Sequence, residues 1–245
     1  MSTSNDSSSI PDQEPPWAWI KCIREMTDPC HARHVVDLPV ELLPWLFLSD
    51  RKSAMDLRKL QEHRITHILS AHAVSPREGQ YYKDRLQGMG ITHKRISCDD
   101  SEGYDMIGRH WDEFLPFLNQ VRETPGARVV VHCVAGINRS GLICCAAHMV
   151  LEQQLLLEVV QQCLDKRGSV LWNRSYQRQL CELAQRHNLL GPAPSGYNND
   201  PLVEIQPAHP PAHYIVNGKL SKERLSDLFE NRLTKHASQA TSDCE

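Results

Sequence analysis

The chain has 245 residues, 40% of them hydrophobic, which suits one folded domain with extensions at its ends. Its formal net charge of −3 provides no basic field for nucleic acid or anionic lipid, so we expect partners to be recognised locally. The nine cysteines are odd in number and form no Cys-x-x-Cys pair, which argues against a disulfide framework and against a zinc site.

The sequence predicts a soluble protein without a membrane anchor. Residues 1–9 lack the basic and apolar regions of a signal peptide, and no apolar run approaches the roughly 20 residues that cross a bilayer. Cys244 lies too near the end for a prenylation box. We therefore expect a cytoplasmic location, with the nucleus as a second one, and a reducing compartment.

The N-terminal extension combines a polar stretch with an apolar cluster. Residues 2–14 are polar and rich in serine, a composition typical of disorder. Trp17, Trp19, Ile20 and Ile23 follow and form a short apolar cluster that is able to dock on a neighbouring domain.

Three segments before residue 125 have the periodicity of regular elements. Ala54, Leu57 and Leu60 recur at helical spacing, and residues 91–98 are strand-like. A helix with an expected kink at Pro116 comes next. One face of this helix is formed by Ile107, Trp111, Phe114, Leu115, Leu118 and Val121.

A short β-branched run leads into the most informative stretch of the chain. Residues 127–131 read Ala-Arg-Val-Val-Val and predict a central strand buried on both faces, so Cys133 lies where a strand ends. Residues 141–151 are almost all apolar or small and predict a buried helix that starts near Ser140. A strand, a tight loop and a helix gather backbone N–H groups and the positive end of the helix dipole at one point, which should bind an anion.

The loop between them reads His-Cys-Val-Ala-Gly-Ile-Asn-Arg-Ser from His132 to Ser140. Gly136 permits backbone conformations that turn successive amides inward. Arg139 adds a planar fork that holds two phosphate oxygens at once, which a lysine could not do. The same positive surroundings favour the thiolate of Cys133. We therefore expect the loop to bind phosphate and to carry its own nucleophile.

These nine residues match the His-Cys-x5-Arg-Ser signature of the protein tyrosine phosphatase superfamily, and the chain resembles its small, atypical dual-specificity phosphatase branch. Upstream, residues 42–50 resemble the family's first strand and turn, with Ser49 where many members have glycine, and residues 65–69 resemble its next strand.

Further resemblance lies downstream of the loop. Arg167 and residues 173–176 resemble the family's arginine and its Asn-x-x-aromatic element, whereas Gly168 and Trp172 stand where many members have proline. By its own chemistry, Asn173 is better suited to cap a helix over residues 175–187 than to contact substrate.

The resemblance implies an α/β fold in three layers, with a central, mostly parallel sheet of about five strands flanked by helices. It covers residues 35–190, which we take as the catalytic domain. Residues 1–34 are the N-terminal extension, and residues 191–245 form a proline-rich linker and an amphipathic C-terminal helix.

The predicted C-terminal helix has one apolar face, and three roles are open to it. It could pack on the domain, cover the site or bind a protein partner, and packing is the preferred interpretation. The residues of that face are Leu220, Leu225, Leu228, Phe229 and Leu233.

The mechanism needs an acid on a separate loop, because expelling an alkoxide or phenoxide from phosphorus is slow unless something protonates it. In the family this acid lies about six positions before the first apolar residue of the following helix, which from Met106 points to Asp100. Asp99 is the alternative. Asp105 is left out because its carboxylate suits the N-cap of that helix.

The expected reaction has two steps and uses no metal and no cofactor. Cys133 attacks phosphorus while Arg139 and the loop amides stabilise the developing charge, and Asp100 protonates the leaving oxygen and then activates water. The resemblance implies that Ser140 donates to the sulfur as it leaves, and His132 is expected to orient the loop. The predicted phosphate-binding residues are Val134, Ala135, Gly136, Ile137, Asn138 and Arg139.

Three other cysteines allow a redox hypothesis. One of Cys98, Cys144 and Cys145 could trap an oxidised Cys133 as a disulfide. For Cys144 and Cys145, packing within the helix is the simpler interpretation.

The resemblance favours a protein phosphatase acting on phosphotyrosine, phosphoserine and phosphothreonine, with a phosphoprotein as partner. The uncharged residues Val134, Ala135 and Ile137 argue against inositol lipids. Asn138 before the arginine also resembles the RNA 5′-triphosphatase branch, which is the enzymatic alternative, although the negative charge of the chain opposes it. A non-catalytic pseudophosphatase is the third hypothesis, yet such proteins typically lose the nucleophile or the arginine.

Overall fold

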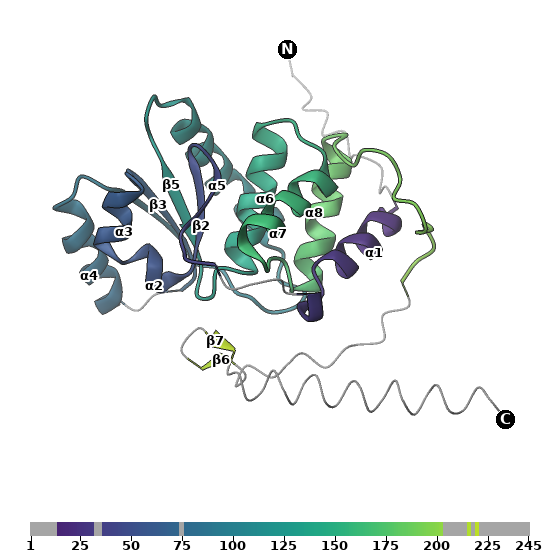
Figure 1. Ribbon diagram of the computed structural model, residues 1–245, viewed down its shortest axis with the longest axis horizontal. Helices are drawn as coiled ribbons and strands as arrows, with labels where there is room; N and C mark the ends of the chain where they lie inside the picture. The colour runs from purple at the N-terminus through teal and green to yellow at the C-terminus, as the bar shows by residue number, and fades with distance from the viewer. Residues whose placement is uncertain (1–13, 32–35, 74–75, 203–214, 217–218, 221–245) are drawn as a thin grey trace, which may run out of the picture. The chain divides into compact units, whose positions relative to one another are not determined.

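The computed structural model describes residues 14–31, 36–73, 76–202, 215–216 and 219–220 (Figure 1). Residues up to Leu202 belong to one unit, and a second unit begins at Val203. The described residues of the second unit are the antiparallel pair β6 (Ile215–Val216) and β7 (Lys219–Leu220). Leu220, expected to lie in the amphipathic C-terminal helix, lies in the strand β7 instead, and the other residues of that expected helix lie outside the described residues.

A five-stranded sheet forms the centre of the first unit, in the order β1-β2-β5-β3-β4. β2 (Leu46–Ser49), β5 (Val129–His132), β3 (His67–Ala71) and β4 (Thr92–Ile96) run parallel, and β1 (Val40–Leu43) pairs antiparallel with β2 at one edge. The β-branched run predicted as a central strand is β5, which is buried along its whole length. The stretch expected as one strand and turn, residues 42–50, contributes to two strands, β1 and β2.

Helices cover both faces of the sheet. Alternate residues of its strands point to opposite sides, and both sides are apolar, so each face packs against a layer of helices. Leu48 and Val131 face one layer, and Phe47 and Val130 face the other. The first layer contains α1 (Trp17–Met26), α5 (Met106–Glu123), α6 (Arg139–Leu151), α7 (Leu156–Arg167) and α8 (Arg174–Arg186). The second contains α2 (Arg51–Ala54), α3 (Leu57–Glu62) and α4 (Pro76–Gln87). This is the three-layer α/β arrangement implied by the resemblance.

The helix expected around residues 54–60 is two short helices, α2 and α3, each with its own N-cap. The Asp50 carboxylate accepts a hydrogen bond from Ser53 N at 2.7 Å, and the Asp56 carboxylate accepts one from Arg58 N at 3.0 Å. The apolar spacing that predicts a helix here is real, but it does not reveal the break between the two caps.

The connection from α7 to α8 explains one departure from the family pattern. α7 ends at Gly168, which has a φ of 80° and donates its N–H to Leu164 O at 2.7 Å. Proline could do neither, since its φ is fixed near −65° and it has no N–H. As predicted, Asn173 then caps α8, accepting from Ser175 N and Tyr176 N.

The N-terminal apolar cluster forms α1, whose Ile20 and Ile23 are fully buried in the same core as α8. Thr27, just beyond α1, is linked to a later loop through a buried side chain. Gln177 Nε2 donates both to Thr27 Oγ1 at 2.8 Å and to Leu171 O at 2.7 Å. α1 thus belongs to the folded body of the first unit.

The chain just after residue 190 also packs on α1. The Tyr197 hydroxyl donates to the Glu25 carboxylate at 2.7 Å, and Asn199 Oδ1 accepts from Ala18 N at 3.0 Å.

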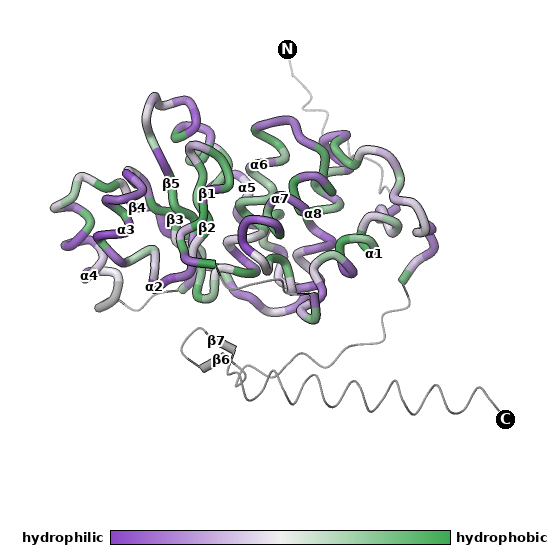
Figure 2. The backbone as a smooth tube through the Cα atoms, viewed as in Figure 1, coloured by the Kyte–Doolittle hydropathy of each residue, from purple (hydrophilic) through white to green (hydrophobic). Residues whose placement is uncertain are grey.

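Hydrophobic residues concentrate on the central strands (Figure 2). No helix in the described ranges has an apolar stretch long enough to cross a membrane.

Candidate active site

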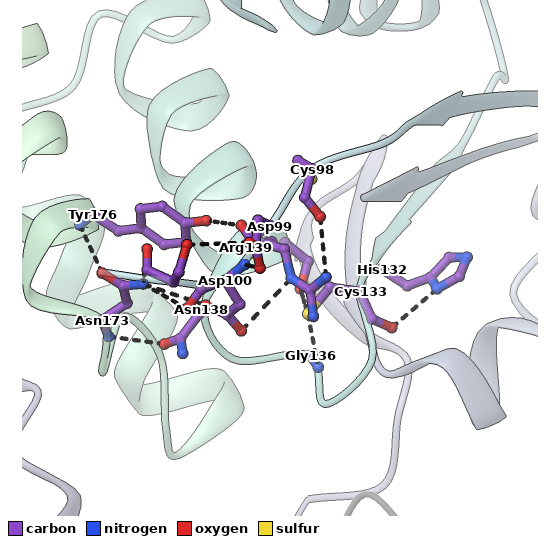
Figure 3. Close-up of polar contacts among 12 residues, drawn as sticks. Cys98, Asp99, Asp100, His132, Cys133, Gly136, Asn138, Arg139, Asn173 and Tyr176 are labelled. Carbon is purple, nitrogen blue, oxygen red and sulfur yellow. Dashed lines mark hydrogen bonds and ion pairs between the residues drawn. The ribbon is translucent and has the colours of Figure 1, made fainter. Parts of the chain in front are cut away.

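Two loops meet beside Arg139 at the carboxyl ends of the parallel strands (Figure 3). We call residues 133–139, between β5 and α6, the phosphate loop, and residues 97–105, between β4 and α5, the acid loop. Because parallel strands end at one edge of a sheet, loops that follow neighbouring strands come together there. α6 begins at Arg139, and the N–H groups of its first turn, which have no partner within the helix, point toward this edge.

The sulfur of Cys133 lies at the base of the phosphate loop and accepts two hydrogen bonds. Gly136 N and Ser140 Oγ each donate to Sγ at 3.3 Å. Donors aimed at a sulfur stabilise negative charge on it. The structure therefore brings Gly136 and Ser140 to the sulfur of Cys133, and the Ser140 contact is the one that the resemblance implies.

The peptide groups of the phosphate loop are held from outside. Arg51 N donates to Val134 O at 3.2 Å, and Leu171 N donates to Ile137 O at 3.1 Å. Arg167 donates from Nη2 to the Ala135 carbonyl and from Nε to the Gly136 carbonyl, both at 3.2 Å. In a trans peptide the next N–H points opposite to the carbonyl, so the N–H groups of residues 135–138 turn toward the inside of the loop. Such a cradle of N–H groups suits a phosphate.

Gly136 is required at its position for two reasons. Its φ is 69°, a left-handed conformation that other residues rarely adopt, and an added Cβ would lie 2.7 Å from Ser49 C and Ser49 O. The buried backbone of Ser49, at the end of β2, thus packs directly against the phosphate loop.

Arg139 joins the two loops. Its Nη1 donates to Cys98 O at 3.3 Å, and its Nε lies 3.6 Å from Asp100 Oδ2. Its side chain is 11% exposed, and that of Asp100 is 32% exposed. The Arg139 guanidinium thus lies between the acid loop and the phosphate loop, with limited access to water.

Asp100 rather than Asp99 takes the position next to Arg139. Burial raises the pKa of the Asp100 carboxyl, while Arg139, Asn173 and Asn138 oppose that rise by favouring its charged form. Asp99 is exposed, and its carboxylate accepts from Asp100 N at 2.7 Å within the loop itself. A raised pKa keeps a carboxyl protonated to higher pH, as an acid catalyst requires.

Asp105 has the structural role expected for it. Its carboxylate accepts from Gly108 N at 2.8 Å and caps α5.

The first turn of α8 holds the acid loop. Asn173 Nδ2 donates to Asp100 O at 3.1 Å and to Asp100 Oδ1 and Ser101 O at 3.4 Å, and the Tyr176 hydroxyl donates to Asp99 O. Asn138 Oδ1 accepts from Asn173 N at 3.0 Å, so Asn138 connects the phosphate loop to the same turn. Asn173 is both the cap predicted from the sequence and a contact of Asp100.

His132 is buried beneath the loop in a hydrogen-bonded chain. Its Nδ1 lies 3.2 Å from Cys133 O and its Nε2 lies 2.7 Å from Ser70 Oγ, which is also 2.7 Å from His93 Nε2. Burial lowers the pKa of His132 to about 3 and that of His93 to about 4. Both rings are therefore neutral near pH 7, so Nδ1 of His132 donates to Cys133 O, and Ser70 donates to His132 and accepts from His93.

The other cysteines near the site are buried thiols. Burial raises the pKa of Cys98 to about 12 and also raises that of Cys144, while a hydrogen bond with Cys163, together with burial, raises the pKa of Cys145. Protonated thiols are weak nucleophiles, so these surroundings suit the packing interpretation better than the redox hypothesis.

Residues 46–186, more than half of the chain, match the family model described as "Dual specificity phosphatase, catalytic domain". The chain belongs to the dual specificity phosphatase family. It is accordingly a cysteine-dependent protein phosphatase, a hydrolase of phosphoric monoesters.

Relatives of this phosphatase include dual specificity protein phosphatase 26 of Bos taurus, 32% identical over 146 residues that cover 60% of this chain and 67% of the relative. Dual specificity protein phosphatase 2 of Homo sapiens is 33% identical over 144 residues, which cover 59% and 43% of the two chains. The crystal structure of DUSP15 is similar with a TM-score of 0.52 and 30% identity, over 61% of this chain and 90% of that one.

Several residues that shape this phosphatase site did not follow from the sequence. Ser70 and His93 lie on β3 and β4, and their contacts with His132 depend on the strand order. Glu102 contacts α8 from the acid loop, and Gln179 of α8 donates to Tyr104 O of the same loop, each across more than 70 residues of sequence. A polar residue in an apolar strand, such as Ser70, is the one local signal that could have marked any of them.

Proposed function

We propose that this phosphatase removes phosphate from phosphotyrosine, phosphoserine and phosphothreonine of protein substrates through a phosphocysteine intermediate. The two donors on Cys133 Sγ, opposite an acid loop that carries a carboxyl of raised pKa, are the observation that carries the proposal. The names of the relatives support the dual specificity.

In the first step the Cys133 thiolate attacks phosphorus, and the bond from phosphorus to the substrate oxygen breaks. The N–H groups of the phosphate loop and Arg139 stabilise the charge on the three other phosphate oxygens. Asp100 gives its proton to the leaving oxygen, which departs as an alcohol or phenol. Asp100 lies 3.6 Å from Arg139, close to where that oxygen would depart.

In the second step water attacks the phosphocysteine. The Asp100 carboxylate accepts a proton from this water, and the bond from sulfur to phosphorus breaks. Ser140 donates to Sγ at 3.3 Å and so stabilises the thiolate as it leaves. His132, neutral and hydrogen-bonded to Cys133 O, is assigned the role of orienting the loop.

The proposal is tested by phosphate release from three matched peptides that carry phosphotyrosine, phosphoserine or phosphothreonine. The unsubstituted enzyme should act on all three, and Cys133→Ser should act on none while still binding them. Cys30→Ser, which changes an exposed cysteine, is the control and should retain full activity. Retained turnover in Cys133→Ser would refute the nucleophile assignment.

The RNA 5′-triphosphatase alternative rested on Asn138, and the contacts of this residue point elsewhere. Asn138 accepts from Asn173 N at 3.0 Å, and together with Asn173 it opposes the rise that burial causes in the pKa of Asp100. Bracing between the two loops accounts for an asparagine before the arginine. Triphosphate-ended RNA belongs in the same assay as a fourth substrate, and we expect no release of phosphate from it.

A further inference from the structure

Four successive residues of the acid loop contact the first turn of α8. The carbonyls of Asp99, Asp100 and Ser101 accept from the side chains of Tyr176 and Asn173. The fourth residue, Glu102, makes its contact through both oxygens of its side chain.

Glu102 places both carboxylate oxygens on the N-terminus of the helix. Oε1 accepts from Arg174 N and Oε2 accepts from Ser175 N, each at 2.9 Å. The first N–H groups of a helix have no partner within the helix, and the positive end of the dipole favours an anion there. Hydrogen bonds to an ionised acceptor are also stronger than neutral ones. Among the described residues 99–102, Glu102 is the one whose carboxylate binds backbone N–H groups of α8.

The two ends of the segment that carries Asp100 are thereby fixed to different elements. At the near end, Cys98 O accepts from Arg139 at the start of α6, and at the far end Glu102 binds α8. Gly103 follows with a φ of 82°, so the chain turns directly after the Glu102 attachment. Further along, Gln179 of α8 accepts from Met106 N at 2.8 Å and Ile107 N at 3.0 Å.

We propose that Glu102 is a positioning residue for the reaction: its carboxylate, bound to Arg174 N and Ser175 N of α8, holds Asp100 where it protonates the leaving oxygen. This inference rests on the proposed function, because it assigns to Glu102 no role apart from that of Asp100.

A series of aryl phosphates with increasingly basic leaving groups tests the inference. Protonation matters little for a nitrophenolate that departs readily, and greatly for an unsubstituted phenolate. The measured quantity is kcat/KM, since it reports the first chemical step, in which the leaving group departs. A purely structural defect would lower kcat/KM for all members of the series alike.

Glu102→Gln keeps the shape of the side chain and removes its charge. We expect kcat/KM to fall about 10-fold for phenyl phosphate, because small misplacement of a reacting group is costly, and less than about 2-fold for p-nitrophenyl phosphate. Asp100→Asn should show the same selectivity with a larger loss, of about 100-fold for phenyl phosphate. Asp56→Asn, which removes a capping carboxylate from α3, is the matched control and should change neither substrate.

The double variant Asp100→Asn/Glu102→Gln separates positioning from any independent effect. If Glu102 acts through Asp100, the double variant loses no more than Asp100→Asn alone; if the two losses multiply, the inference is wrong. An equal loss on all leaving groups in Glu102→Gln, or no loss at all, also overturns it. Failure of Asp100→Asn to show leaving-group selectivity would instead refute the acid assignment of the proposed function.

Discussion

The phosphate loop and the acid loop lie on either side of Arg139, but different parts of the chain fix them. The phosphate loop follows β5 directly, contains a glycine with a φ of 69°, and ends in the first residue of α6. The acid loop also runs from a strand to a helix, but residues 99–102 within it are held by α8, more than 70 residues later. Damage to the first loop should therefore abolish phosphate binding, whereas damage to the second should leave binding and impair proton transfer.

The largest effect should come from Gly136→Ala. The new Cβ would lie 2.7 Å from the Ser49 backbone and would require a left-handed conformation, so we expect kcat/KM to fall about 100-fold for every substrate. Competitive inhibition by inorganic phosphate should weaken in parallel. Gly126→Ala is the control, because Gly126 has a similar φ of 75° with nothing within 4 Å of the added Cβ. Equal losses in both variants would show that strain, and not the clash with β2, is responsible.

The stability of the protein should fall in acid because of His93, which belongs to the hydrogen-bonded chain beneath the phosphate loop. His93 is held neutral in the fold with a pKa of about 4, whereas a histidine in the unfolded chain has its ordinary value of 6.5. The contribution of neutral His93 to the free energy of unfolding is fully present above pH 6.5. It is lost as the pH falls toward 4, and the loss is about 2 kcal/mol at pH 5. His93→Gln, which keeps an N–H donor for Ser70, should reduce the difference between urea unfolding free energies at pH 7 and pH 5.

The matched control for acid sensitivity is His31→Gln, since His31 is exposed. It should leave the pH dependence of unfolding unchanged. An undiminished pH dependence in His93→Gln would contradict a neutral buried ring at this position.

Arg167→Lys should separate the two loops kinetically. Lysine keeps the charge but cannot reach both the Ala135 and Gly136 carbonyls with a planar fork. We expect kcat/KM to fall about 10-fold, equally for p-nitrophenyl phosphate and phenyl phosphate, because the phosphate cradle and not the acid is displaced. Dependence on the leaving group would mean that the two loops are coupled through Arg167.

The smallest effect should be a gain in stability from Asp100→Asn. Burial raises the pKa of Asp100, so its ionised form opposes folding at pH 7, and this penalty disappears as the pH falls through the folded pKa to below 3.8. The variant should melt at a higher temperature than the parent at pH 7 and at the same temperature at pH 3. Asp112→Asn, on the exposed face of α5, should show no such difference. A lower melting temperature at pH 7 would contradict the direction of the pKa shift.

The sequence predicted those parts of the site that depend on neighbouring residues. The strand before Cys133, the helix from Arg139 and the caps at Asp105 and Asn173 all follow from local periodicity and side-chain chemistry. The split into β1 and β2 and the break between α2 and α3 escaped prediction, because neither changes the apolar spacing.

Contacts across the sheet and between distant loops could not be predicted from one sequence. The register of the motif favoured Asp100 over Asp99, but the contact with Arg139 that supports this choice needs the fold. Ser70 and His93 come together only because β3 lies between β5 and β4. Glu102 carries no sequence signal that separates it from any other exposed glutamate.

The edge strand β1 has a practical consequence for work on shortened versions of this protein. The family region begins at Leu46, yet β1 (Val40–Leu43) pairs with β2 along the edge of the sheet, and Leu42 is buried. A chain that started at Leu46 would leave the backbone of β2, a wholly buried strand, as a bare edge open to pairing with other molecules. We expect such a fragment to aggregate on expression, and one that starts ahead of α1 to stay in solution.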